Sequence, residues 1–288
     1  MNVQTLDQGR ITVAKEFLLL VQAIGLDVFD KVMAIPGGEV MRDFPGRRTV
    51  RLEWASPEGR VQGVFLKRYE PRYLSAAGRL LRRLGWPSAR DEAEREWQGI
   101  QAVRALGIRT AAPVAFGQQK LAGVVARSFL MTAEIVGGID GDRHLRQLGP
   151  AGRRAFLARV AALTRRLHDG GLVHKDLYVS HILAAAAAGE SPGQVAERES
   201  ELYLIDLQRL MKPCCRGARW RVKDLGALAY SALKAGASPR DLLAAWLEYC
   251  GTKRLTPNER TRARRVLRRV AWLKTRTPKH DKDFQQLP

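Results

Sequence analysis

The stretch His174-Lys175-Asp176-Leu177-Tyr178-Val179-Ser180-His181 is the most informative part of this sequence. It places Asp176 beside a loop, next to an apolar run that has the character of a strand. A second carboxylate, Asp206, has the same setting in Leu204-Ile205-Asp206-Leu207-Gln208. Two carboxylates held in this way suit phosphoryl transfer, because one orients the attacking hydroxyl and the other holds Mg²⁺. The sequence therefore predicts a phosphoryl-transfer site.

The length and composition of the chain allow two lobes that share a cleft. The chain has 288 residues, and 45% of them are hydrophobic, so a sizeable core can form. The formal net charge is +20, from 49 Lys and Arg against 29 Asp and Glu. Such an excess attracts nucleic acid, anionic lipid headgroups or anionic substrates, but it does not determine a fold.

The cysteines and the apolar runs indicate a reduced, water-exposed compartment. The three cysteines are Cys214, Cys215 and Cys250, an odd number without the CxxC spacing of a metal site. The longest early apolar run, at 17–21, is far shorter than the roughly 20 residues of a membrane span. We expect a cytoplasmic protein that is soluble or peripheral on the inner face of the cytoplasmic membrane.

Hydrophobic periodicity predicts an α+β fold with two lobes. An N-terminal sheet of antiparallel strands with one helix, expected at 88–107, precedes a mainly helical region. Short strand and loop are also expected at 172–183, and 184–201 is read as a low-complexity insertion. The expected organisation is a helical extension at 1–35, an N-lobe at 36–133, a C-lobe at 134–252 and a basic helix or tail at 253–288.

The stretch around Asp176 resembles the catalytic loop of the protein-kinase-like superfamily, H-R-D-x-x-x-x-N. In that comparison Asp176 takes the catalytic position, and His181 falls where the kinase Asn stands. Asp206 then corresponds to the metal-binding acid of the D-F-G segment. The resemblance implies ATP and Mg²⁺ as cofactors.

A closer resemblance is to the bacterial lipopolysaccharide kinases, the family of the inner-core heptose kinases and Kdo kinases. Their catalytic loop resembles H-x-D-x-Y-x-x-H-x-L, and their metal segment resembles I-D-L-H-R, from which this chain departs at Gln208. The likeness runs from about residue 25 to 250, and the heptose kinases are the nearest group. It implies a phosphotransferase that uses ATP on a sugar hydroxyl of the lipopolysaccharide core, most readily a heptose. Further similar stretches are 38–42, 46–49, 95–97, 113–117 and 219–225.

Lys67 lies in a strand that is apolar on both faces, so its ammonium group needs an anionic partner. Kinases pair such a lysine with a helix glutamate and place it on the ATP phosphates. At 100° per residue, Glu96 lies beside the apolar stripe of its helix, whereas Glu94 faces solvent. We therefore expect Glu96 to be the partner. The alternatives are a lysine that reaches the surface and a solvated glutamate.

The remaining nucleotide contacts are less well defined by the sequence. The phosphate loop has a single glycine, so Arg47 or Arg48 could contact phosphate, although a solvated hairpin turn fits equally well. The resemblance places adenine at the connector near Thr132 and Glu134. It also assigns ATP-binding roles to these residues.

Four further residues lie in or beside the predicted catalytic loop. His181 is either a ligand of the metal or phosphate, or a buried histidine with ordinary hydrogen bonds. Asp224 either supports the loop from a helix or is a simple acid at the helix start. His174 is placed in the same supporting group, and His168 is expected to be structural.

Two basic segments indicate an anionic partner. Arginines alternate with leucines at 72–90, and Lys and Arg greatly outnumber acids at 253–283. A basic amphipathic helix is typical of a membrane-surface element, and each cation near an anionic leaflet contributes roughly 1 kcal/mol. A solvated helix face is the alternative. Nucleic acid ranks lower, because no aromatic platform or reading helix accompanies the charge.

Two rival functions remain open at this point. The first is a kinase of the same fold that acts on Kdo, a small sugar or a protein. The second is a non-catalytic kinase-like protein that binds membrane or RNA. The departure at Gln208 and the unusual phosphate loop leave room for the second.

Overall fold

The computed structural model describes residues 2–55, 61–70, 91–121, 124–185, 200–215 and 217–276. The chain divides into two compact units: Met1–Ala102 with Thr110–Val136, and Val103–Arg109 with Gly137–Pro288. The finer domain boundaries expected from the sequence remain predictions. The basic segment at 72–90, most of the 184–201 insertion and the end of the tail lie outside the described residues.

A seven-stranded sheet forms the centre of the first unit. Its strand order is β1-β2-β6-β7-β5-β4-β3, and every neighbouring pair is antiparallel. The strands are β1 (Val3–Leu6), β2 (Ile11–Ala14), β3 (Glu39–Phe44), β4 (Arg47–Ala55), β5 (Val61–Tyr69), β6 (Pro113–Leu121) and β7 (Val124–Ala133).

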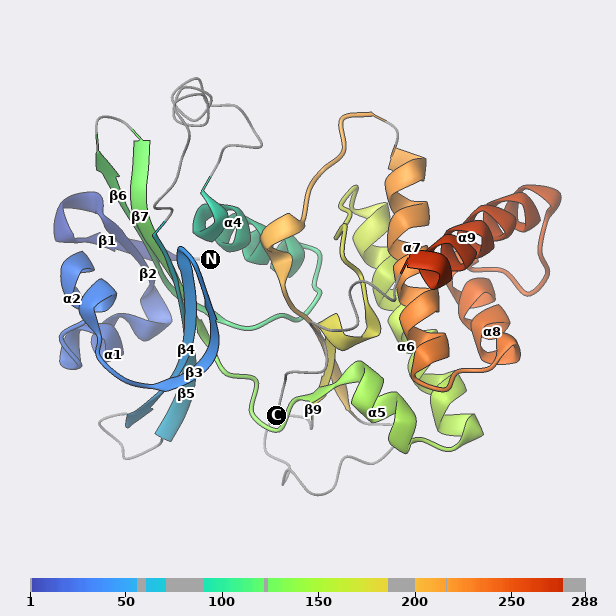
Figure 1. Cartoon of the computed structure of the whole chain (residues 1–288), viewed down its shortest axis with the longest axis horizontal. Coiled ribbons are helices and arrows are strands. Elements are labelled where there is room, and N and C mark those ends of the chain that lie inside the picture. Colours follow the sequence, from blue (N-terminus) through green and yellow to red (C-terminus); the bar gives the residue numbers. More distant parts are fainter. Residues whose placement is uncertain are drawn as a thin grey trace. The chain divides into compact units, whose positions relative to one another are not determined.

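Alternation of side chains gives this sheet two different faces. On one face, Val50, Leu66 and Met131 lie on adjacent strands and are fully buried. This face is covered by the short helices α1 (Leu18–Ala23) and α2 (Phe29–Ala34) (Figure 1). The opposite face is covered by α4 (Glu92–Ala105), as Figure 1 shows. Side chains of α4 can therefore contact only every second residue of β5, namely those that point to the α4 face.

The first fourteen residues differ from the expected helical extension. They form β1 and β2, and β2 pairs with β6 of the sheet. Among the described residues of that segment, α1 and α2 are α-helical, and Asp7–Gly9 and Lys15–Phe17 are short 3₁₀ helices. Ile11 and Val13 are fully buried, as a strand with one face on the core requires. Val13 also fits a helical period with Phe17, so the periodicity alone was ambiguous.

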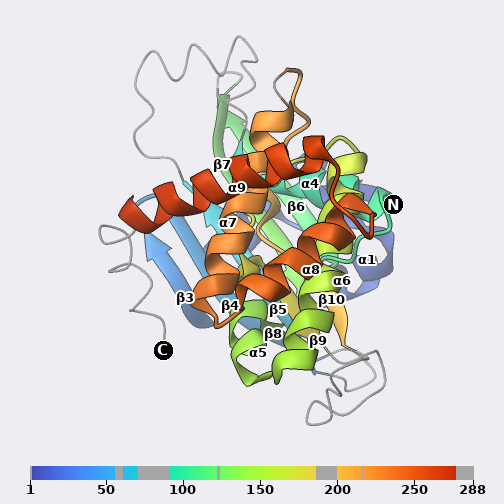
Figure 2. The same cartoon turned by 90° about the vertical axis from the view of Figure 1, so that its right-hand side faces the viewer.

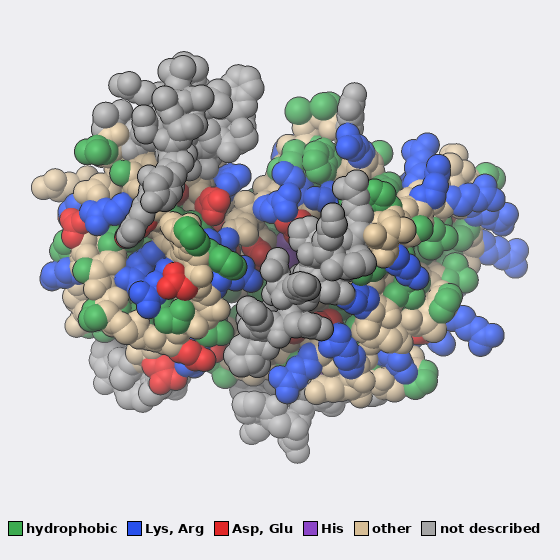
Figure 3. Space-filling view, in the orientation of Figure 1, with side chains coloured by type: hydrophobic (Ala, Val, Ile, Leu, Met, Phe, Trp, Pro, Cys, Tyr) green, Lys and Arg blue, Asp and Glu red, His purple; other side chains and the backbone are tan. Residues whose placement is uncertain are grey.

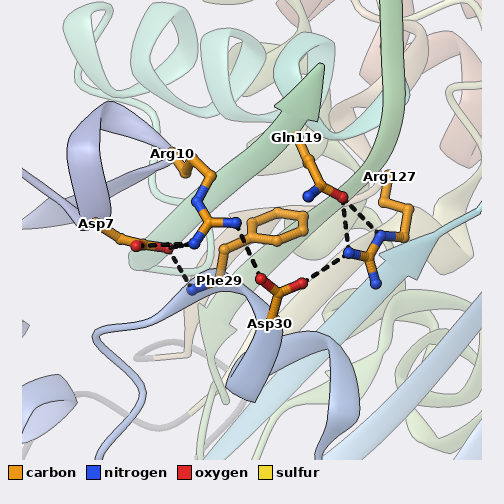
Figure 4. A network of polar contacts seen from close by, with 6 residues as sticks. All are labelled: Asp7, Arg10, Phe29, Asp30, Gln119 and Arg127. Atoms are coloured by element: carbon orange, nitrogen blue, oxygen red, sulfur yellow. Dashed lines mark hydrogen bonds and ion pairs between the residues drawn. The ribbon is translucent and has the colours of Figure 1, made fainter. Parts of the chain in front are cut away.

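A polar network holds the N-terminal segment against the sheet (Figure 4). Arg10 contacts Asp7 and Asp30, and Asp30 is also bound by Arg127 of β7 at 2.7 Å. The Arg10 guanidinium holds the pKa of Asp7 below its usual value. Residues 1–35 are thus part of the first unit rather than an appendage.

The second unit is mainly helical. Its helices are α5 (Gly141–Gln147), α6 (Pro150–Asp169), α7 (Gly217–Lys234), α8 (Pro239–Cys250) and α9 (Pro257–Arg276). In Figure 2, α8 lies along α6 and α9 crosses α7, and both pairs are in contact. None of the helices in the described ranges has the length and apolar character needed to cross a bilayer.

A small sheet beside these helices has the order β10-β9-β8, formed by β10 (Glu201–Leu204), β9 (Ile182–Ala185) and β8 (Ile139–Asp140). Within 172–183, where short strand and loop were expected, Val173 forms a single bridge with Met211 and a continuous strand begins at Ile182. Val173 and Leu177 are buried as anchors of a loop, and this burial imitates a strand pattern. Ala184 and Ala185, assigned to the insertion, belong to β9.

Candidate active site

Lys67 of β5 and Glu96 of α4 form an ion pair within the first unit. The Lys67 Nζ lies 2.6 Å from the Glu96 Oε1, and the two side chains are 18% and 4% exposed. Lys67 points to the α4 face because its neighbours Leu66 and Arg68 point to the other. The second carboxylate oxygen of Glu96 is buried without a hydrogen-bond partner among the described residues. Glu96 thus retains acceptor capacity on its second oxygen.

Register separates Arg47 from Arg48, the two alternatives that the sequence offered for a phosphate contact. Arg47 pairs with Tyr69, and its guanidinium lies 5.4 Å from the centre of that ring, on the face that carries Lys67. Arg48 pairs with Arg68, which is on the α2 face and donates to the carbonyl oxygen of Met33 at 2.8 Å. Only Arg47 therefore shares a face with Lys67.

The connector residues have well-defined surroundings. Thr132 is buried near the end of β7. The Glu134 carboxylate receives two hydrogen bonds from Arg51, at 3.0 and 2.8 Å, and its backbone amide donates to Gly63 O at 2.8 Å. A side chain at Gly63 would have to displace the Glu134 carboxylate. The Glu134 side chain is thus occupied by Arg51 and its amide by Gly63, which leaves the backbone carbonyl oxygen of Glu134 as the group able to contact a base.

In the second unit, Asp224 of α7 holds the loop that precedes Asp176. This fully buried carboxylate accepts the backbone amides of His174 at 2.7 Å and Lys175 at 2.8 Å. Lys175 has a φ of 74°, a left-handed conformation that non-glycine residues rarely adopt. Such strain persists where the surroundings determine it, and the Asp224 clamp supplies that determination.

His168 at the end of α6 completes the support of Asp224. Its Nε2 lies 3.3 Å from the Asp224 carboxylate, and its Nδ1 lies 2.9 Å from the Tyr249 hydroxyl. Burial raises the pKa of Tyr249 to about 12. His168 is fully buried, so it reaches no substrate directly.

His174 connects the Asp176 loop with the Asp206 segment. Its Nε2 donates a hydrogen bond to the carbonyl oxygen of Ile205 at 2.9 Å. Burial lowers the pKa of His174, so the ring is neutral. Val173 and Met211 exchange backbone hydrogen bonds at 2.9 and 3.0 Å. These contacts align the two carboxylate-bearing segments with each other.

His181 and Asp206 form the candidate metal position. The His181 Nδ1 lies 2.7 Å from the Asp176 carbonyl oxygen and must donate to it, because a carbonyl only accepts. A neutral ring then turns its Nε2 lone pair toward the Asp206 Oδ2, 3.7 Å away. Two electron-rich groups in this arrangement leave a place for a cation.

Asp206 itself has the features of a cation ligand. Its φ and ψ are both 58°, and its Oδ1 is buried without a hydrogen-bond partner in the described part of the chain. No cluster of three or more His, Cys, Asp or Glu that could hold a metal occurs among the described residues. Mg²⁺ suits a site of this kind, because it is usually bound through one or two carboxylates, substrate phosphates and water.

The Asp176 carboxylate is in contact with two cations that the sequence analysis did not assign. The Arg209 Nη1 lies 2.6 Å from its Oδ2, and the Lys223 Nζ lies 3.8 Å from its Oδ1. Both residues fall in stretches that carried the family resemblance, which was the only available signal. Lys175 and Lys223 also lie 5.3 and 5.8 Å from the centre of the Trp220 ring.

The site residues thus fall into two groups, one in each unit. Lys67 and Glu96 meet in the first, whereas Asp176, His181 and Asp206 meet in the second. A sheet with a lysine–glutamate pair, followed by a helical unit with a strained Asp-bearing loop, defines the class of protein-kinase-like phosphotransferases. The expected two-lobe α+β fold is confirmed.

Comparison with known proteins identifies the family. The model of the lipopolysaccharide kinase (Kdo/WaaP) family matches residues 36–249, so the chain belongs to this family. The family is one of kinases, which implies the use of ATP. The individual roles of the site residues remain predictions.

Named relatives and a solved structure agree with this assignment. The chain is 30% identical over 223 residues to lipopolysaccharide core heptose(I) kinase WaaP of Escherichia coli, a match covering 76% of this chain and 79% of the relative. It is 31% identical over 234 residues to WaaP of Pseudomonas aeruginosa, with the same coverage. A structure of WaaP in complex with acyl carrier protein superposes with a TM-score of 0.66 at 28% identity, covering 94% of this chain and 98% of that chain.

Proposed function

We propose that this protein transfers the γ-phosphate of ATP to a hydroxyl group of a heptose in the lipopolysaccharide core, with Mg²⁺ as the metal. The named relatives support the heptose acceptor. The observation that carries the catalytic part is His181, which contacts both the Asp176 backbone and the Asp206 carboxylate. This contact ties a candidate base to a candidate metal ligand.

The nucleotide would be held mainly by the first unit. Lys67, positioned by Glu96, would contact the phosphates, and Arg47 would assist from the same face of the sheet. Arg48 is the weaker candidate, because it lies on the face of Arg68. Backbone groups near Thr132 and Glu134 would read the adenine, as the family resemblance implies.

The second unit would perform the transfer. Asp206, with the His181 Nε2, would hold Mg²⁺, which supplies charge neutralisation for the phosphates. Asp176 would orient the acceptor hydroxyl and take its proton. His174 and Asp224 would keep the Asp176 loop in its strained conformation. Positioning and electrostatic stabilisation then account for most of the catalysis.

An anionic environment would suit the basic surface of the second unit. Lys and Arg side chains gather over α9 (Figure 3), where those at 260, 264, 265, 268 and 274 are exposed. Leu267 and Trp272 are exposed among them, at 57% and 41%. This composition fits a helix that rests on an anionic bilayer, so we place the enzyme on the inner face of the cytoplasmic membrane.

A second partner is favoured by an apolar cavity in the same unit. The cavity measures about 320 Å³ and lies among α6, α7, α8 and α9, with Leu228, Trp246 and Leu267 in its lining. The solved relative is described in complex with acyl carrier protein. Since an acyl chain requires an apolar site, we propose that this chain also binds an acyl carrier protein there.

Co-purification of acyl carrier protein with this chain tests the proposal. It should be lost in Leu267→Glu and retained in Leu19→Glu, whose side chain is 80% exposed in the first unit.

The function is tested by mass spectrometry of lipopolysaccharide from cells with and without this protein. Loss of one phosphate from a core heptose, restored by the wild-type gene, is the expected result. Loss of phosphate from Kdo would show that Kdo is the acceptor, and the class of reaction would remain the same. An unchanged lipopolysaccharide would contradict the proposal.

A further inference from the structure

The carboxylate proposed to act as the base is already engaged by a cation. The Arg209 Nη1 contacts the Asp176 Oδ2 at 2.6 Å, a charge-assisted distance. A carboxylate oxygen used in this way has less capacity to accept a proton from a sugar hydroxyl. Some event must therefore move Arg209 before the proposed transfer can occur.

The Arg209 side chain has the position, exposure and length to leave Asp176. It is the last residue of the short turn η5 (Leu207–Arg209), which begins immediately after Asp206. Its side chain is 49% exposed, so the guanidinium can leave Asp176 without becoming a buried, unpaired charge. Its long side chain lets the charged group swing while the turn stays in place.

Lys223 behaves differently. Its side chain is 26% exposed and lies against the Trp220 ring, and its Nζ is 3.8 Å from the Asp176 Oδ1. Burial lowers the pKa of Lys223, while Asp176 opposes that effect. Lys223 can therefore keep one oxygen of Asp176 oriented after Arg209 has left.

The surroundings attract anions. Arg209 and Lys223 contact Asp176. The Lys175 Nζ lies 5.3 Å from the centre of the Trp220 ring. Two cations thus contact one carboxylate, and a third lies against the neighbouring Trp220 ring. A further anionic group can approach here and compete with Asp176 for a guanidinium, whose flat donor array matches phosphate and carboxylate.

We propose that Arg209 is an acceptor-binding residue that leaves Asp176 for an anionic group of the saccharide, either phosphate or carboxylate. This inference rests on the proposed function and adds that the acceptor must be charged. Once Arg209 has moved, Asp176 takes the proton of the acceptor hydroxyl. The hydroxyl oxygen bonds to the γ-phosphorus, the bond from that phosphorus to the bridging oxygen breaks, and ADP leaves. The enzyme thereby distinguishes a charged sugar acceptor from neutral sugars and water.

The test compares Arg209→Met and Arg209→Lys with a matched control, Arg165→Met. Arg165 is 47% exposed and lies in an ion pair with Asp169 in the last turn of α6, rather than with Asp176. Three acceptors are used: deacylated core oligosaccharide, the same oligosaccharide after phosphatase treatment, and methyl heptoside, which is neutral. Transfer and acceptor-free ATP hydrolysis are measured for each enzyme, together with its melting temperature.

We expect Arg209→Met to lower kcat/KM for the charged oligosaccharide by about 10- to 100-fold, the usual value of a hydrogen bond to a charged group. Transfer to methyl heptoside and acceptor-free ATP hydrolysis should both rise, because Asp176 is released from Arg209. Arg209→Lys should restore part of the preference. The phosphatase-treated acceptor shows which anion is recognised: an unchanged effect of Arg209→Met identifies carboxylate, and a smaller one identifies phosphate.

Two results would overturn the inference. An equal loss of kcat/KM on charged and neutral acceptors would make Arg209 a structural residue. An unchanged ratio of kcat/KM for the charged over the neutral acceptor, without added ATP hydrolysis, would exclude Arg209 from acceptor binding. Wild-type transfer reports separately on the proposed function. If the wild type transfers to none of the three acceptors, the proposed function fails and this inference falls with it.

Discussion

The two ion pairs of the site have the same length and different burial. Lys67–Glu96 and Arg209–Asp176 both measure 2.6 Å, but the side chains of the first are 18% and 4% exposed, and those of the second are 49% and 23% exposed. Removing one partner of a buried pair is costly, because the other partner is left as an uncompensated buried charge. An exposed pair exchanges readily with water or ligand. The first pair can serve as fixed architecture, and the second can take part in each turnover.

The exposed pair is tested first by Asp176→Asn, which keeps the size of the side chain and removes the base. We expect kcat for phosphate transfer to fall by about 10²- to 10⁴-fold, the usual contribution of a general base. Transfer from labelled ATP to core oligosaccharide measures this, with the melting temperature as a check of folding. A well-folded Asn variant with wild-type kcat would exclude Asp176 as the base.

The buried pair is tested through stability. Lys67→Met alone should lower the free energy of unfolding by about 3–5 kcal/mol, because Glu96 is left buried and unpaired. The double variant Lys67→Met/Glu96→Gln should recover much of this loss. Urea denaturation of the single and double variants gives the coupling energy. Arg209→Met should stay within about 0.5 kcal/mol of the wild type, as expected for an exposed position. Equal losses at Lys67 and Arg209 would remove the contrast.

Asp224→Asn sharpens the comparison by changing a buried carboxylate that binds backbone rather than a cation. Asparagine has one acceptor oxygen, so it cannot serve the amides of His174 and Lys175 together, and one of them loses its partner. We expect a loss of about 1–3 kcal/mol in the free energy of unfolding. Transfer should fall as the loop relaxes, while the KM for ATP changes little. A variant with unchanged stability would show that the clamp is dispensable.

A smaller effect should come from His174, whose pKa burial lowers from the ordinary value of 6.5. Below pH 6.5 the unfolded chain binds a proton that the folded chain resists. His174 therefore contributes full stability above that pH and loses it as the pH falls toward its folded pKa. The slope is at most about 1.4 kcal/mol per pH unit. His174→Gln keeps a donor for Ile205 O and should flatten the profile between pH 6.5 and 5. Parallel profiles for both proteins would contradict this.

Local patterns predicted a good part of this fold. An apolar run located the strand with Lys67, which is part of β5, and the helix expected at 88–107 is α4. The rule of 100° per residue selected Glu96 over Glu94 as the partner of Lys67, and the structure contains that ion pair. These successes share one cause: each depends on which side chains share a face within a single element.

The misses depend on contacts between distant parts of the chain. Val13 satisfies both a helical and a strand period, and its pairing with Ala115 of β6 decides for the strand. Arg47 and Arg48 must face opposite ways in any strand, but only the register Arg47↔Tyr69 shows which of them accompanies Lys67. Neither fact is present in the local pattern.

The sequence by itself determined the class of chemistry, the two carboxylates and the alternating faces, because these follow from residue type and short-range spacing. Only the tertiary structure decided that Arg209 and Lys223 meet Asp176, and that Asp224 holds the strained turn at Lys175. The physical reason is that a charge is positioned by the elements that pack around it. Those elements are brought together by burial of apolar faces, which no local spacing records.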